Sequence, residues 1–208
     1  MYGIDISNHN RDFVLSNNMG KHLFATADFV WMKATEGKSF VDKSVDTYVE
    51  KAYLADKDVV GFYHYARPDL NNYAEEAEHF CKEVKRMCQD LYSVVLLALD
   101  WEGLSLSCST EWALKWLQYV ENTMGVKPLV YVSESVANSS EWDDIVSEDY
   151  GLWVAKWSAY KPEPGAWPFY AFHQYASSPI DLDIFNGNVS ALKKYGKSAV
   201  GLAVSLYG

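Results

Sequence analysis

Two acidic residues stand one position apart at the end of an apolar run, where Leu96–Leu99 is followed by Asp100, Trp101 and Glu102. Side chains two positions apart in an extended chain point to the same side, so both carboxylates would face one site with their Cα atoms about 6.6 Å apart. Two acids this close repel each other, and one of them therefore keeps its proton to a higher pH. A protonated acid beside an ionised one is the pair that hydrolysis of a glycosidic bond requires.

The alternative is that the two acids simply end a strand and face water. Two further acids weaken this alternative, because Asp5 and Asp181 also fall in expected strands, near opposite ends of the chain. A carboxylate buried in a strand costs stability unless the group is paired or used. The pattern therefore favours a functional site over a solvated strand end.

The elements that must position these acids alternate between strands and helices. Helical faces are expected at 45–53, 77–91 and 113–124, the last one opened by Ser109 as N-cap. After the fifth expected strand, helices give way to short loops that contain Pro and Gly, with room for one short helix near Glu141. Eight strands are expected, several of them apolar enough to be buried on both faces. These are Tyr2–Ile6, Phe29–Lys33, Val59–Tyr65, Val94–Asp100, Leu129–Ser133, Leu152–Lys156, Phe169–Tyr175 and Asp181–Phe185.

This order predicts an α/β fold, an irregular TIM-like barrel of eight strands with helices mainly in the first half, (β/α)5(β)3-like. A doubly wound open sheet is the alternative, and no glycine-rich nucleotide motif decides between the two. The barrel is favoured because polar residues fall at or just beyond the ends of different strands, where barrel enzymes build their sites. These residues are Asp5, Glu36, His64, Arg67, Asp100, Glu102, Lys156, Gln174 and Asp181.

The composition fits a single globular domain of 208 residues, with 49% hydrophobic and 22% charged residues. The net charge of −10 makes nucleic acid and anionic membranes poor partners, because clusters of Lys and Arg bind both of these. No apolar run is long enough for a membrane span, and the first residues show no secretory signal. The 8 Trp and 15 Tyr suit a site that stacks on sugar rings, or a large core.

Cysteine and histidine give no sign of a metal or a cofactor. The three cysteines, Cys81, Cys88 and Cys108, are an odd number and are expected to be free, buried thiols. Cys81 and Cys88 would lie about 10 Å apart along one helix, too far for a disulfide. The five His show no zinc-ligand spacing, so we predict no metal site and no cofactor.

Seven segments share a further pattern, in order along residues 1 to about 187. They are Gly3–Ser7, Lys33–Gly37 with Phe40 and Asp42, Gly61–Pro68, Leu99–Glu102, Pro128–Tyr131, Leu152–Ala155, and Gln174–Tyr175 with Ile180–Asp183. In these segments the chain resembles the family 25 glycoside hydrolases, the Chalaropsis-type muramidases (lysozymes) of bacteria, phages and fungi. Two departures are Asn8–Arg11, where the family often has Gln or Gly, and Asp183, where many members have Asn.

The resemblance implies an irregular eight-stranded barrel and hydrolysis of the β-1,4 bond between N-acetylmuramic acid and N-acetylglucosamine in peptidoglycan. By position in the matching segments, Glu102 is the general acid/base and Asp100 assists it, either by stabilising the transition state or by orienting the substrate's N-acetyl group. Asp5 and Asp181 complete an acidic floor. The attacking group stays open between a protein carboxylate and the acetamido group of the substrate.

Seven further residues are predicted to bind substrate: Glu36, Tyr63, Tyr65, Tyr131, Trp153, Lys156 and Gln174. Several of them have a structural alternative, and Lys156 and Gln174 could bind neighbouring acids instead of the substrate. Tyr63, Tyr131 and Trp153 could pack in the core, as could Trp157, and Glu36 could pair with Lys33 or Arg67. Tyr63 and Tyr65 share one face of their strand and His64 the other, while Trp101 is expected to point away from the acids.

Two other functions stay open. A chitinase-like hydrolase would carry a longer D-x-x-D-x-D-x-E run, whereas apolar Leu96 and Ala98 precede Asp100 here. A peptidoglycan-binding module without catalysis would be expected to lack Glu102, which is present.

Residues 1–196 are predicted to form the catalytic domain, and residues 197–208 a C-terminal tail or the start of a linker. Glycan strands of bacterial peptidoglycan are the expected partner. The charge of −10 gives no attraction to an anionic wall, which favours an added wall-binding module or a partner subunit. Without a visible leader, the chain suits a phage or prophage lysin released through a holin, or a secreted enzyme.

Overall fold

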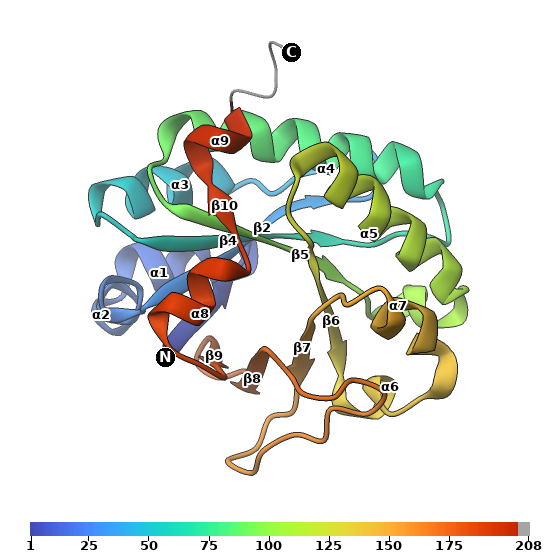
Figure 1. Cartoon of the computed structure of the whole chain (residues 1–208). Coiled ribbons are helices and arrows are strands. Elements are labelled where there is room, and N and C mark those ends of the chain that lie inside the picture. The colour runs from blue at the N-terminus through green and yellow to red at the C-terminus, as the bar shows by residue number, and fades with distance from the viewer. Residues whose placement is uncertain (204–208) are drawn as a thin grey trace.

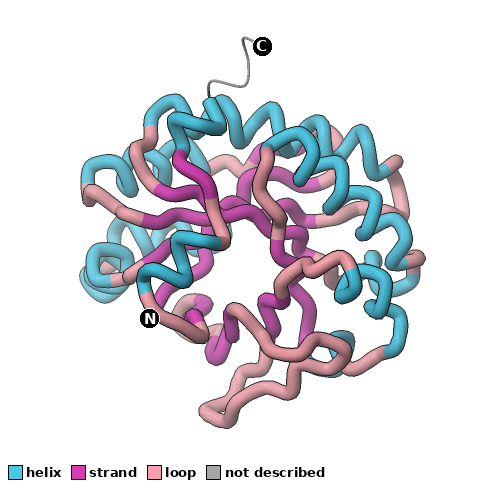
Figure 2. The backbone as a smooth tube through the Cα atoms, in the orientation of Figure 1, coloured by secondary structure: helices cyan, strands magenta, loops and turns pink. Residues whose placement is uncertain are grey.

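Eight strands form a closed barrel in the computed structural model, which describes residues 1–203 (Figures 1 and 2). Around the barrel the strands follow the order β1-β9-β8-β7-β6-β5-β4-β2, and parallel pairing of β1 with β2 closes it. This closure confirms the predicted barrel and excludes the open sheet. The strands are β1 (Tyr2–Ile6), β2 (Phe29–Glu36), β4 (Val59–Tyr65), β5 (Val94–Asp100), β6 (Leu129–Ser133), β7 (Leu152–Ala155), β8 (Phe172–Ala176) and β9 (Asp181–Phe185).

The pairs β1–β2, β2–β4, β4–β5, β5–β6, β6–β7 and β7–β8 are parallel. β9 runs antiparallel to both of its neighbours, β1 and β8. The observed strands differ from the expected ones mainly at their ends. β2 continues to Glu36, where it pairs with the short β3 (Phe40–Val41). β8 begins only at Phe172, and Phe169, which was expected to open this strand, lies exposed in the preceding loop.

Helices follow each of the first five strands of the barrel, and loops join the last three (Figure 2). The predicted helices are present, and Ser109 caps α5 as predicted by accepting a hydrogen bond from the Glu111 amide. The helical elements of this half are α1 (Arg11–Ser16), α2 (Asn18–Thr26), α3 (Val45–Leu54), α4 (Tyr73–Met87), η2 (Cys88–Asp90), η3 (Gly103–Ser107), α5 (Thr110–Met124), α6 (Glu134–Ala137), η4 (Ser140–Trp142) and α7 (Asp143–Ser147), with η1 (Asn8–Asn10) opening the series.

Alternation along β5 shows how the barrel sorts its side chains. Leu96 and Ala98 lie among the aromatic residues inside the barrel, whereas Leu97 and Leu99 pack between the wall and the helices. Continuing this period of two turns Asp100 inward at the carboxyl end of the strand. Trp101 turns outward and is buried in the helix-facing core, as predicted.

The barrel interior beneath the acids is filled by aromatic rings. Trp31 stacks on Trp153 with ring centroids 4.7 Å apart, and Phe172 meets the Trp31 ring edge-on. The Trp31 ring lies directly over Gly61, where a Cβ atom would come within 2.0 Å of it. The interior is therefore a packed floor that leaves space only at the open end.

The C-terminal elements cover the opposite end of the barrel and its outer wall. They are α8 (Val189–Lys194), β10 (Lys197–Ser198), which pairs with the start of β5, and α9 (Ala199–Ala203), which packs on η2 and α4. Thus residues 197–203 of the predicted tail pack against the rest of the chain, and residues 204–208 lie outside the described residues.

The structure also bears on the predictions for the cysteines and for membrane-spanning segments. All three cysteines are free, and Cys81 and Cys88 are buried, but the expectation of burial is wrong for Cys108, which lies partly exposed just after η3. Within residues 1–203, no helix has both the length and the apolar character needed to cross a membrane.

Candidate active site

A cavity of about 350 Å³ opens at the carboxyl ends of the parallel strands. Because β9 runs the other way, its first residue, Asp181, reaches the same rim as Asp5 at the far end of β1, and the two are paired in register. Four carboxyl groups from distant parts of the chain are thus brought together. The lining residues are Asp5, Ser7, His9, Lys33, Tyr63, Tyr65, Asp100, Glu102, Tyr131, Trp153, Trp157, Gln174 and Asp181.

Asp100 and Glu102 both line this cavity. Asp100 is buried, and its Oδ1 has no hydrogen-bond partner among the described residues. Burial raises the pKa of the Asp100 carboxyl well above its usual range, and the charge of Glu102 adds to this. Partial burial also raises the pKa of Glu102, the more open of the two residues. The pair therefore holds a proton to higher pH than an isolated acid would.

Lys33 is a cavity residue that the sequence reasoning left out of the site. Its ammonium group binds Glu36 Oε2 at 2.8 Å and lies 4.5 Å from the centre of the Tyr65 ring. The positive charge of Lys33 lowers the pKa of both Asp100 and Glu102, against the effect of burial. The signal was present in the sequence, because Lys33 follows inward-facing Trp31 by two positions in an expected strand.

Asp5 and Asp183 form a second acidic pair, in which Asp5 lines the cavity and Asp183 does not. Asp183 is fully buried and accepts a hydrogen bond from Trp153 Nε1 at 2.8 Å. The other oxygen of Asp183, Oδ2, has no hydrogen-bond partner among the described residues unless a proton is shared with the Asp5 carboxyl, which lies close enough for the two groups to shift each other's pKa. Burial, then the charges of Asp183 and Asp181, raise the pKa of Asp5 well above normal; burial raises the pKa of Asp183 to about 7.

Asp183 entered the sequence analysis only as a departure from the family pattern. The i, i+2 rule used for Asp100 and Glu102 would also have placed Asp183 on the same face of its strand as Asp181. Asp181 itself is less buried, and burial raises its pKa to about 6.

Gln174 links the acidic floor to the aromatic wall. Its Nε2 donates to Asp5 Oδ2 at 2.8 Å, and its Oε1 accepts from Tyr131 OH at 3.0 Å and from Trp157 Nε1 at 2.9 Å. The amide orientation follows from these partners, since a flipped amide would face two donors with its own N–H groups. One side chain thus positions an acid, a phenol and an indole.

Two of the predicted substrate-binding residues lie outside the lining of the cavity. Glu36 pairs with Lys33 and, at 3.4 Å, with Arg67. Lys156 extends to Glu134 Oε1 at 2.8 Å. The other predicted residues, Tyr63, Tyr65, Tyr131, Trp153 and Gln174, all line the cavity together with the four acids.

His64 has the opposite orientation to its neighbours Tyr63 and Tyr65. It is completely buried between Thr35 Oγ1 and Glu76 Oε2, each 2.8 Å from one ring nitrogen. This arrangement fixes the start of α4 against the barrel wall and has no access to the cavity.

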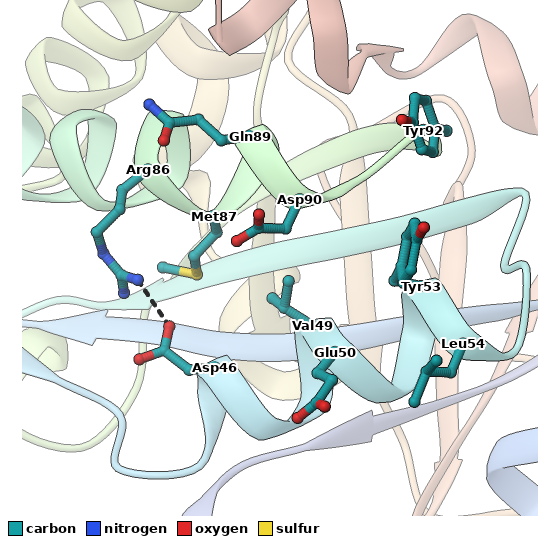
Figure 3. A pocket seen from close by; sticks show the side chains of 10 residues that line it. All are labelled: Asp46, Val49, Glu50, Tyr53, Leu54, Arg86, Met87, Gln89, Asp90 and Tyr92. Carbon is teal, nitrogen blue, oxygen red and sulfur yellow. Dashed lines mark hydrogen bonds and ion pairs between the residues drawn. The ribbon is translucent and has the colours of Figure 1, made fainter.

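A separate depression lies on the outside of the barrel, between α3 and residues 86–92 (Figure 3). An ion pair of 2.8 Å between Arg86 and Asp46 crosses it. It lies on the outer helical layer, away from the carboxyl ends of the strands, and brings together no comparable set of buried acids.

The family model for glycosyl hydrolases family 25 matches residues 4–196, which is nearly the whole chain. The chain belongs to this family. Among curated relatives, the uncharacterized protein YegX of Escherichia coli (strain K12) is 28% identical over 177 residues, covering 80% of this chain and 62% of its own length. Lysozyme M1 of Streptomyces globisporus is 25% identical over 210 residues, 91% of this chain and 69% of that protein.

The fold of this family 25 glycosyl hydrolase also matches solved structures. A muramidase from Trichobolus zukalii superposes with a TM-score of 0.74 at 24% identity, covering 95% of this chain and 99% of the other. At that identity the likeness concerns the fold. The chain spans about three fifths of the length of YegX and half of an autolytic lysozyme from Clostridium acetobutylicum.

Proposed function

We propose that this family 25 glycosyl hydrolase is an N-acetylmuramidase that cleaves the β-1,4 bond between N-acetylmuramic acid and N-acetylglucosamine in bacterial peptidoglycan. The observation that carries the proposal is the convergence of Asp100 and Glu102, both with raised pKa, on the strand-end cavity. Family membership and the lysozyme and muramidase names of similar proteins support the substrate class.

Glu102 would act as the general acid. It is the more open of the two acids, so it can reach a glycosidic oxygen at the cavity mouth while its raised pKa keeps the proton available. Proton transfer to that oxygen accompanies breakage of the bond from C1 of the muramic acid to O4 of the leaving N-acetylglucosamine. Water then adds at C1, and its proton returns to the Glu102 carboxylate.

Asp100, Asp5 and Asp181 would stabilise the positive charge that develops on the sugar ring. They surround the cavity beside Glu102, and a low-dielectric floor of aromatic rings strengthens their field. Tyr63, Tyr65, Tyr131, Trp153 and Gln174 would contact the sugar. Glu36 and Lys156 would act one step away, through Lys33 and through the loop that Glu134 anchors.

The test is loss of turbidity and release of reducing ends from purified bacterial cell walls by the wild type and by Glu102→Gln. We expect the variant to lose activity by about 10²-fold or more, the usual scale for a general acid. Mass spectrometry of the released muropeptides identifies the bond that is cut. A wild type that sediments with walls and releases no reducing ends would refute hydrolysis and favour the peptidoglycan-binding module.

The route to the wall is a further part of the proposal. Release through a holin and secretion both remain predictions, as do the catalytic-domain boundary at residue 196 and a wall-binding module or partner subunit.

A further inference from the structure

The depression on the outside of the barrel, between α3 and residues 86–92, has a volume of about 610 Å³ and is called the outer depression below (Figure 3). It shares no lining residue with the acidic cavity. Two buried apolar side chains, Val49 and Met87, contribute to its lining and connect it to the helix-facing core. The outer depression is therefore a second, separate hollow with an apolar base.

One end of the outer depression is aromatic. The rings of Tyr53 and Tyr92 lie with their centroids 6.1 Å apart, and the two residues are 51% and 81% exposed. Leu54, which is 73% exposed, lines the same end. A cluster of exposed large apolar groups is typical of a binding surface, and the electron-rich faces of aromatic rings attract organic cations.

The charges of the lining select the sign of an occupant. Three carboxylates, from Asp46, Glu50 and Asp90, face one guanidinium group, from Arg86, so the lining carries 1 − 3 = −2. The Arg86 charge is already balanced by Asp46 and by Glu83, each at 2.8 Å. Among the ion pairs of residues 1–203, none involves Glu50 or Asp90. Charge complementarity therefore favours a positively charged occupant over a neutral glycan or an anionic polymer.

The two unpaired carboxylates come from different elements. Glu50 belongs to α3 and Asp90 to η2, and Figure 3 shows them between the Arg86–Asp46 ion pair at one end and the tyrosine rings at the other. An aliphatic chain that ends in a primary ammonium group fits this order, because its methylene groups can pack on the apolar base while the ammonium group binds the carboxylates and the ring faces. The volume has room for several residues of a peptide that carries such a chain.

The aromatic end of the outer depression lies toward the amino ends of the strands. Tyr53 stands shortly before β4, which begins at Val59, and Tyr92 shortly before β5, which begins at Val94. The acidic cavity opens at the carboxyl ends of the same strands, so a ligand in one hollow leaves the other free. Two contacts with one polymer raise its effective concentration at the enzyme without any change in the catalytic site.

We propose that the outer depression, through Glu50, Asp90, Tyr53 and Tyr92, binds the amine-bearing peptide stem of peptidoglycan. The inference rests on the proposed muramidase function for the identity of the polymer, and it adds a second contact with that polymer. A stem whose diamino acid keeps a free amine supplies both the aliphatic chain and the ammonium group. Bound there, a stem holds the enzyme on the wall while the acidic cavity takes up and releases glycan.

Binding can be measured without hydrolysis. We would titrate the wild type with a synthetic stem tetrapeptide that contains lysine, and with the same peptide acetylated at the lysine side chain, and follow the methyl resonances of Val49, Leu54 and Met87. We expect saturable shifts with the free amine and about fivefold weaker binding after acetylation. Equal binding of the two peptides, or no shift, would overturn the inference. If a tetramer of N-acetylglucosamine moved these methyl groups and the peptide did not, the surface would bind sugar instead.

The carboxylates are tested with the double variant Glu50→Gln/Asp90→Asn. The matched control is Glu141→Gln/Glu148→Gln, which also removes two exposed carboxylates that line neither hollow. We expect about fivefold weaker peptide binding and weaker sedimentation with intact walls for the first variant, and less than twofold change for the control. Release of reducing ends from a soluble, peptide-free glycan should be unchanged in both. Equal peptide binding by the two double variants would refute the role of Glu50 and Asp90.

The rings are tested with Tyr92→Ala. Tyr160→Ala is its control, because Tyr160 is 80% exposed and lines neither hollow. We expect about threefold weaker peptide binding for the Tyr92 variant and none for the control. Equal binding by the two variants would refute the part of the rings.

The outcomes separate this inference from the proposed function. If the wild type cleaves walls but the peptide moves none of the methyl groups, the stem site is refuted and the muramidase stands. If the wild type cleaves nothing but binds the peptide through its amine, and Glu50→Gln/Asp90→Asn weakens this binding, the stem site stands and hydrolysis is refuted.

Discussion

The buried Asp5–Asp183 pair makes the stability of this protein depend on pH. The pKa of Asp183 is about 7 in the folded protein against a usual 3.8, so the folded state holds a proton that the unfolded chain releases. Stability is therefore highest below pH 4 as far as this group is concerned, and is lost as pH rises from about 4 to about 7. At 1.36 kcal/mol per pKa unit, the shift corresponds to about 4 kcal/mol above pH 7.

Asp183→Asn removes the part of this dependence that belongs to Asp183, while keeping the shape of the side chain. The Asn amide can donate permanently to Asp5, and its oxygen can still accept from Trp153 Nε1. Because Asp5 shares the proton, we expect the variant to recover roughly half of the loss, about 2 kcal/mol at pH 8, and to match the wild type near pH 4.

Urea denaturation at a series of pH values between 4 and 8 measures both quantities. Asp90→Asn is the control. Asp90 is exposed, so its substitution removes one negative charge without changing the acidic cavity. The reasoning is refuted if Asp183→Asn is less stable than the wild type at pH 8, or if its stability falls with pH as steeply as that of the wild type.

Two further predictions concern Lys33 in the cavity and the buried His64. Lys33→Met should move the alkaline limb of the kcat/KM profile to higher pH, because Lys33 lowers the pKa of Asp100 and Glu102; an unmoved limb in pH-rate measurements would contradict this. His64→Leu should destabilise the protein by about 1–3 kcal/mol in urea denaturation. It removes one hydrogen bond from the buried Glu76 carboxyl, which keeps those from Asn71 Nδ2 and the Arg67 amide, and it leaves the buried Thr35 hydroxyl without its partner. Destabilisation below 1 kcal/mol would show that the His64–Glu76 contact contributes little.

Features that depend on a few neighbouring residues could be predicted from the sequence. The two-residue period of a strand predicted that Asp100 and Glu102 face one site, and the Ser109 cap predicted the start of α5. The order of apolar strands and helical faces predicted eight strands with helices mainly in the first half, and the polar residues at the strand ends favoured a barrel over an open sheet. These signals are local, because side-chain direction and capping are set within one or two turns of backbone.

The partners of each polar side chain were decided only by the closed barrel. The reversed direction of β9 brings Asp183 against Asp5 from 178 positions away, and the strand order sets Lys33 beside the Asp100–Glu102 pair. The same packing turns Glu36 and Lys156 toward Arg67 and Glu134 instead of the cavity. Burial and charge proximity depend on which strands become neighbours, and no local period in the chain encodes that choice.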